Sequence, residues 1–286
     1  MEDLGVVHFV GLALYTFEDL LTQGPAAVEL MKELQRLFPQ AALNQVLDAT
    51  LHSETGQAPE AHRCAWEELQ QAIEGGKIAR FRAKSEPCDQ ASQTGVWMSL
   101  NATRTRPGHP NYLWLRLPME SFVQAEETVE ALLEFGCQAF TSLRAAYGYA
   151  GIRISGTSSE AVNRAINRSI GGIPLGDFFD VNIETEFRSR IKGAFWANFL
   201  SRTHVEALGG MDHVARTAPC WRVQPLAGEG LLLVLSENPV YRDEKTEQAR
   251  YAALREFLAP IITTRTPAIP PALARAGREI RRSFTT

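Results

Sequence analysis

The residues best suited to chemistry in this sequence are the carboxylates of the segment GDFFDVNIETEF, residues 176–187. Paired carboxylates at short spacing serve as general acid and base, or as ligands of a divalent cation. In an extended segment Glu184 and Glu186 fall on the same face and form a patch of like charge. A solvated loop and a partner-binding surface are the alternatives to catalysis, and binding is the functional use that we favour. The carboxylates concerned are Asp177, Asp180, Glu184 and Glu186.

A second group of carboxylates lies on the helix predicted over about residues 122–147. Glu126, Glu130 and Glu134 recur at four-residue steps, which places them in one row along that helix. Apolar residues at three- and four-residue steps occupy the opposite face and predict the side that packs on the core. Such a glutamate row is either a solvated helix face or a surface for a basic partner, and both interpretations stay open.

The sequence lacks the local patterns of the common enzyme classes. It contains no HExxH pair, no CxxC pair, no GxSxG nucleophile elbow, no Walker A loop and no GxGxxG fingerprint. His62 and Cys64 lie two residues apart near an expected helix start, where their side chains would point away from each other. We therefore expect no catalytic residue, no metal ion and no cofactor.

The charge distribution disfavours nucleic acid as the direct partner. The chain of 286 residues has a formal net charge of −4. Residues 264–286 contain five arginines and one glutamate, so this tail carries +4 and the remainder of the chain −8. An acidic body repels phosphate and attracts a basic protein instead.

Cysteine usage and hydropathy predict the compartment. Cys64, Cys88, Cys137 and Cys220 are widely spaced, which is typical of free thiols in a reducing compartment. Glu2 and Asp3 stand where a signal peptide carries positive charge. No apolar run reaches the roughly eighteen residues of a membrane helix. We expect a cytoplasmic protein without a membrane partner.

Strand and helix patterns alternate irregularly along the chain, and a hairpin interrupts them. This order predicts an α+β fold with a mixed, largely antiparallel sheet or sheets flanked by helices, and two similar halves are one option. We expect halves at 1–110 and 111–263 and a basic, Pro-containing tail at 264–286, with one continuous domain as the alternative. The predicted strands are 6–17, 43–51, 77–83, 96–102, 112–117, 151–155 and 191–200, the hairpin is 221–235, and the helices are 24–38, 59–74, 122–147, 159–170, 203–208 and 243–262.

The segment RIKGAFWANFLSRTHVEALGG, residues 190–210, and its acidic lead-in carry a family resemblance. An FDV turn, an IKG-aromatic strand, an NFL step and a Gly-Gly stop follow one another between Asp180 and Gly210. This order resembles the signature region of the TsiV-like immunity proteins of type VI secretion. The segment ARYAALREFLAPI resembles the closing helix of that family, whereas the basic tail has no place in the family pattern.

The resemblance implies a protein that binds and does not catalyse. Such proteins neutralise a co-encoded antibacterial toxin by direct contact, and many of these toxins look like nucleases delivered to the cytoplasm. An acidic inhibitor would be steered to the basic groove of a nuclease and could take the place of DNA phosphates. A carboxylate- or metal-dependent hydrolase or transferase, and an effector-loading adaptor or chaperone, remain alternatives. The expected toxin-binding residues are Asp177, Asp180, Glu184, Glu186, Glu126, Glu130 and Glu134.

Overall fold

The computed structural model describes two compact units, which we treat separately. One unit is Leu12–Gly148, and the other joins Met1–Gly11 to Tyr149–Thr286. The chain passes between the units inside strand β1 (Val7–Thr16) and inside strand β7 (Tyr147–Ser155). The residues described are 7–20, 22–38, 45–51, 61–62, 66–75, 77–84, 97–101, 108, 110–123, 126–155, 186–240 and 244–263.

The unit Leu12–Gly148 is built on a sheet with the strand order β3-β2-β4-β5-β6-β1. Antiparallel pairing joins β2 to β3 and β4, β4 to β5, and β5 to β6. Strands β5 and β6 come from opposite sides of residue 110 and pair with each other in this unit. The strands are β2 (Gln45–Leu51), β3 (Ala61–His62), β4 (Ile78–Lys84), β5 (Trp97–Asn101) and β6 (Asn111–Pro118).

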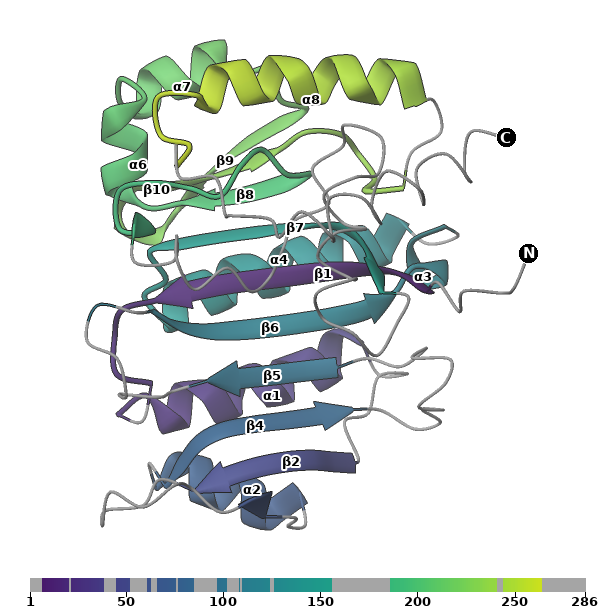
Figure 1. Cartoon of the computed structure of the whole chain (residues 1–286), viewed down its shortest axis with the longest axis vertical. Helices are drawn as coiled ribbons and strands as arrows, with labels where there is room; N and C mark the ends of the chain where they lie inside the picture. The colour runs from purple at the N-terminus through teal and green to yellow at the C-terminus, as the bar shows by residue number, and fades with distance from the viewer. Residues whose placement is uncertain are drawn as a thin grey trace, which may run out of the picture. The chain divides into compact units, whose positions relative to one another are not determined.

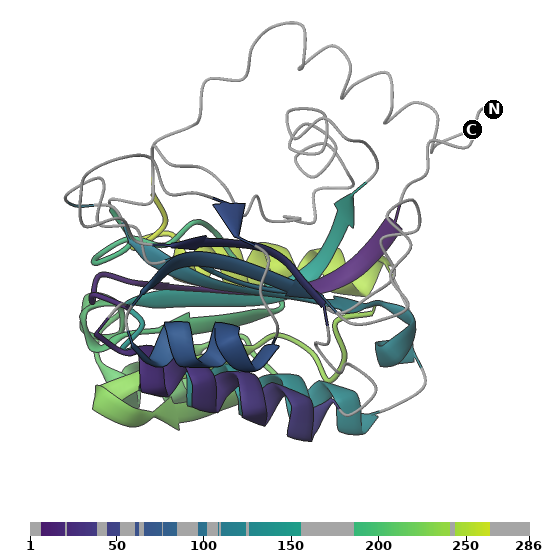
Figure 2. The ribbon, with the colours of Figure 1, turned by 90° about the horizontal axis from the view of Figure 1, so that it is seen from below.

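Three helices of this unit, α1 (Gly24–Leu37), α2 (Trp66–Glu74) and α4 (Glu126–Ser142), cover one face of its sheet (Figures 1 and 2). Helix α1 packs against both α2 and α4. A short helix, α3 (Glu120–Val123), precedes α4. Each long helix buries its apolar side and leaves its polar side exposed, as the periodicity predicts. The buried side chains include Leu30, Met31, Leu34, Leu132, Leu133, Phe135 and Phe140.

The second unit has the strand order β7-β8-β10-β9, and β10 pairs antiparallel with β8 and β9. Every residue of β10 is buried, whereas β9 is half-exposed along most of its length. The β9–β10 hairpin turns through the short 3-10 helix η3 (Ala227–Glu229). The remaining elements are β8 (Ala197–Leu200), β9 (Arg222–Leu226), β10 (Gly230–Val234), α6 (Arg202–Ala207), α7 (Met211–Thr217) and α8 (Glu244–Leu258).

The predicted α+β class is confirmed, and most predicted elements are present. Two helix predictions were too long. The helix expected from Pro59 begins at Trp66, because Ala61–His62 pairs with β2 as the strand β3. The helix expected to reach about Tyr147 ends at Ser142. Past that point the Ala146 amide donates to the Tyr15 carbonyl, so sheet pairing replaces the helix.

The predicted strand 191–200 is regular only at Ala197–Leu200. The Asn198 side chain stops the strand from extending back through Phe195, because it forms hydrogen bonds with both the amide and the carbonyl of Phe195. Helix α7 was not expected, whereas the stop at Gly209-Gly210 is confirmed by positive φ angles of 99° and 91°. The helix expected over 159–170 and the tail 264–286 lie outside the described residues. In the part of the chain that the structure describes, we find no helix with the length and hydropathy of a bilayer span.

Candidate partner-binding surface

The outer sides of α1, α2 and α4 form a strongly acidic surface, which we call the acidic helix face. The three helices carry nine glutamates and two cationic residues, a net charge of −7. Eight of these glutamates are exposed and Glu33 is half-buried. The glutamates are Glu29, Glu33, Glu67, Glu68, Glu74, Glu126, Glu127, Glu130 and Glu134, and the cations are Lys32 and Arg36.

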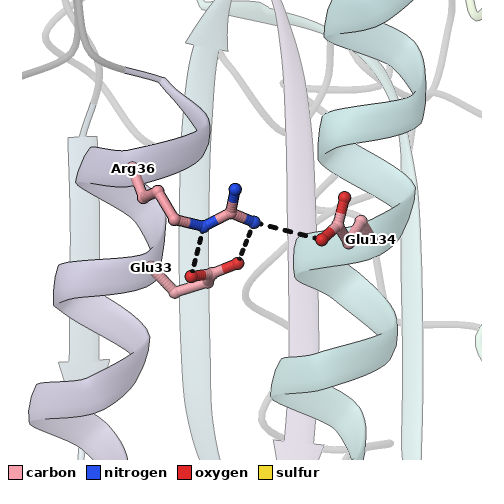
Figure 3. A network of polar contacts seen from close by, with 3 residues as sticks. All are labelled: Glu33, Arg36 and Glu134. Atoms are coloured by element: carbon pink, nitrogen blue, oxygen red, sulfur yellow. Dashed lines mark hydrogen bonds and ion pairs between the residues drawn. The ribbon is translucent and has the colours of Figure 1, made fainter.

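Arg36 joins α1 to α4 within this face (Figure 3). Its Nε donates to Glu33 at 2.8 Å, and one terminal nitrogen reaches Glu33 at 2.5 Å and Glu134 at 3.1 Å. The hydrogen bonds from Arg36 lower the pKa of the Glu33 carboxyl, and the same bonds raise the pKa of Arg36. Exposed ion pairs of this kind orient side chains more than they stabilise a fold.

Lys32 is the other cation of the face, and it is also engaged. Its Nζ lies 2.7 Å from a Glu29 carboxylate oxygen. The hydrogen bond and charge of Glu29 raise the Lys32 pKa, and the charge of Glu74 on α2 adds to this effect. The two cations therefore lie close to carboxylates from all three helices, and the face keeps a large negative surplus.

The structure places the predicted row Glu126, Glu130 and Glu134 as the helical spacing indicated. All three residues are exposed on α4, whose buried side carries Val129, Leu133 and the other core residues. The sequence analysis missed the glutamates of α1 and α2. The spacing of Glu29 and Glu33 was visible, but only the packing of three helices side by side shows that these charges belong to one surface.

Of the acidic lead-in, Glu186 alone lies within the described residues, and it is half-buried. The Thr263 hydroxyl donates a 2.6 Å hydrogen bond to its carboxylate. Asp177, Asp180 and Glu184 lie outside the described residues. Glu186 therefore takes part in an internal contact of its own unit, 77 residues away in sequence.

That contact belongs to a clamp, formed by residues 186–191 on the segment 260–263 that follows α8. The Ile191 amide donates to the Ile261 carbonyl, and the Thr263 amide donates to the Ile191 carbonyl, both at 2.8 Å. The Arg190 guanidinium donates to the Pro260 carbonyl at 2.6 Å. The start of the signature region thus fixes the end of the last helix. The contacts of residues 186–191 with residues 260–263 therefore give this segment a structural role in its own unit.

His204 is buried and Cys220 is half-buried, and both belong to the same unit. Burial lowers the pKa of His204 to about 4, so its ring is neutral near pH 7. Its Nε2 donates to the Arg190 carbonyl at 3.3 Å, which leaves Nδ1 as the acceptor of the Ser201 hydroxyl at 2.9 Å. Burial raises the pKa of the Cys220 thiol to about 12. Neither group is set up for acid–base or nucleophilic chemistry at neutral pH.

No cluster of three or more His, Cys, Asp or Glu side chains suited to a metal ion occurs among the described residues. The acidic helix face is complementary in charge to a basic surface.

This chain is similar to known proteins in two respects, a family profile that matches its sequence and a solved structure with a similar fold. The profile of the TsiV family, described as type VI immunity for VRR-NUC, matches residues 29–277. A type VI secretion system (T6SS) protein of Pseudomonas aeruginosa has a similar structure, with a TM-score of 0.66 at 15% sequence identity. The similarity covers 96% of this chain and 82% of that one, and at this identity it shows a shared fold. No match was found among curated proteins.

Proposed function

This chain belongs to the TsiV family of type VI immunity proteins, and we propose that it neutralises a nuclease effector by binding it directly and occluding its DNA-binding groove. The family description names VRR-NUC as the target of immunity, which supports a nuclease as the partner. Because such an effector would attack DNA in the cytoplasm, the proposal places the immunity protein there.

The observation that carries the proposal is the acidic helix face. A nuclease binds the phosphate backbone through clustered Lys and Arg, so its groove presents a positive potential. A surface with a net charge of −7 on three adjacent helices complements that potential. Electrostatic complementarity mainly accelerates encounter, and steered association reaches about 10⁸–10⁹ M⁻¹s⁻¹ at low ionic strength. We assign the exposed row Glu126, Glu130 and Glu134 to this surface.

The alternatives differ from the proposal in what they require. A hydrolase or transferase would need the carboxylates of residues 177–186, which in part lie outside the described residues. An adaptor or chaperone would bind the effector and leave its nuclease active. Inhibition of the effector at stoichiometric concentrations distinguishes occlusion from both alternatives.

The test uses the cognate VRR-NUC effector that the proposal requires, and it measures DNA cleavage and the rate of association. Glu126→Lys with Glu130→Lys should lower kon by about tenfold or more at low salt and weaken inhibition, because the attraction is long-range. Glu134 is left unchanged because it pairs with Arg36. Glu237→Lys with Glu256→Lys makes an equal charge change at exposed positions of the other unit and serves as the control.

A kon that falls equally in both double variants would show an effect of net charge alone and would refute the assignment to the acidic helix face. Full nuclease activity in the presence of excess wild-type protein would refute occlusion. Toxicity of the effector in cells that co-express the wild-type protein would refute immunity towards this effector.

A further inference from the structure

The charge of the acidic helix face is unevenly divided among its three helices. Helix α2 carries three glutamates and no cation, a net charge of −3, and α4 carries four glutamates and no cation, a net charge of −4. Helix α1 lies between them and carries two glutamates with Lys32 and Arg36, so its net charge is zero (Figure 1). The face therefore consists of two acidic strips with a neutral strip between them.

The two cations of the neutral strip are accessible to a partner. Lys32 and Arg36 are four residues apart, so they lie in one row on the exposed side of α1. Their side chains are 52% and 59% exposed, although each is bonded to a glutamate. Arg36 also reaches Glu134 on α4 (Figure 3), and the charge of Glu74 on α2 raises the pKa of Lys32. Both cationic heads therefore lie in the middle of the face, within reach of further carboxylates.

The groove of a nuclease has the opposite order of charge. Its flanks bind the phosphate backbones of DNA through Lys and Arg. Its centre, where the scissile phosphate lies, holds carboxylates when the enzyme uses divalent cations for catalysis. A uniformly acidic inhibitor would attract the flanks and repel this centre. The acidic strips of α2 and α4, with the cationic heads of α1 between them, complement all three parts of such a groove.

Ionic strength decides whether a partner meets one summed charge or three separate strips. The axes of packed neighbouring helices are about 8–10 Å apart. At about 0.01 M salt the Debye length is about 30 Å, so the whole face acts as a single charge of −7. At physiological ionic strength it is about 8 Å, close to the spacing of the strips, so each strip acts mainly on the groups opposite it. Long-range steering and pairing at contact therefore depend on different features of the same face.

We propose that α1 lies over the metal-binding centre of the nuclease effector, where Lys32 and Arg36 pair with the carboxylates that otherwise hold its divalent cations. In this arrangement the glutamates of α2 and α4 contact the basic flanks of the groove. The inference rests on the proposed function and names the part of the nuclease that each helix meets. Because the two cations and the metal ions require the same carboxylates, the immunity protein and the metal compete for the effector.

The experiment measures kon and koff of the intact protein and the purified VRR-NUC effector by surface plasmon resonance, at about 0.01 M and about 0.15 M salt. Lys32→Gln with Arg36→Gln makes the face more negative by two charges. At low salt the kon of this double variant should equal or exceed that of wild type, because the long-range attraction grows. At the higher salt its koff should rise by about tenfold or more, because two pairs with the carboxylates of the partner are lost.

Arg216→Gln with Arg255→Gln is the matched control, since it makes the same charge change at exposed positions of the other unit. Its koff should stay within about twofold of wild type. Circular dichroism verifies the fold of each variant.

Mg²⁺ provides a second readout, with EDTA as the metal-free reference and the ionic strength held constant. Mg²⁺ should weaken the binding of wild type by about tenfold, because it occupies the carboxylates that Lys32 and Arg36 require. Its effect on the Lys32→Gln, Arg36→Gln variant should be much smaller, because that variant no longer competes with the metal.

The outcomes separate this inference from the proposed function. A koff of the Lys32→Gln, Arg36→Gln variant equal to that of wild type, or a rise that the control shares, would overturn the placement of α1. An effect of Mg²⁺ that is equally large in this variant would also overturn it, since Mg²⁺ would then screen the glutamates and Arg36 would only orient Glu33 and Glu134. A wild-type protein that neither binds nor inhibits the effector would overturn the proposed function itself.

Discussion

The burial of His204 makes a quantitative prediction about stability and pH. His204 has no exposed surface, and it is held between the Ser201 hydroxyl and the Arg190 carbonyl. Its folded-state pKa of about 4 lies below the ordinary value of 6.5. Above pH 6.5 the ring is neutral in both states, so the full stability is present. As the pH falls from 6.5 towards 4, the unfolded chain takes up a proton that the folded protein excludes, and stability is lost.

The magnitude follows from the two pKa values. Each unit of difference corresponds to about 1.4 kcal/mol, so between pH 7 and pH 4.5 this one group should remove about 2.5 kcal/mol from the free energy of unfolding. His204→Gln keeps a side-chain N–H for the Arg190 carbonyl and does not titrate. The variant should be less stable than wild type at pH 7, because it loses the acceptor of the Ser201 hydroxyl.

The assay is urea unfolding at half-unit pH steps, with wild type and His204→Gln compared at each step. The stability advantage of wild type should shrink by about 2.5 kcal/mol from pH 7 to pH 4.5. Other groups titrate in both proteins and cancel in this difference. A difference that stays constant with pH would refute the argument that His204 is buried in its neutral form.

Three further predictions concern packing, the clamp and thiol reactivity. A methyl group added at Gly24 would overlap the Ile73 carbonyl oxygen, so Gly24→Ala should cost about 1–3 kcal/mol in urea unfolding; an unchanged midpoint would contradict the α1–α2 packing. Glu186→Gln replaces the charged acceptor of the Thr263 hydroxyl and should speed amide hydrogen exchange at Thr263 by about tenfold, from a loss of ~1–2 kcal/mol, whereas unchanged exchange would argue against the clamp. Cys220 should react with iodoacetamide at pH 8 far more slowly than a model thiol, because its pKa is raised to about 12, and mass-mapped alkylation at an ordinary rate would refute this raised pKa.

The sequence by itself determined the local elements and their class. β1, α1 and the β9–β10 hairpin follow from apolar periodicity and from stops at glycine and proline, which act within a few residues. The same local rule placed the row of Glu126, Glu130 and Glu134 on one side of α4. The family resemblance also came from sequence, because its motifs lie close together in the chain.

Only the tertiary structure decided where distant residues meet. Past the end of α4 at Ser142, the Ala146 amide pairs with the Tyr15 carbonyl, a contact that no helical window contains. Glu186 looked like part of a charged patch, and its bond to Thr263 makes it part of a clamp. The acidic helix face exists because α1, α2 and α4 pack on the same side of one sheet (Figure 2). Local patterns encode the period and the ends of an element, whereas its neighbours are chosen by packing across the whole chain.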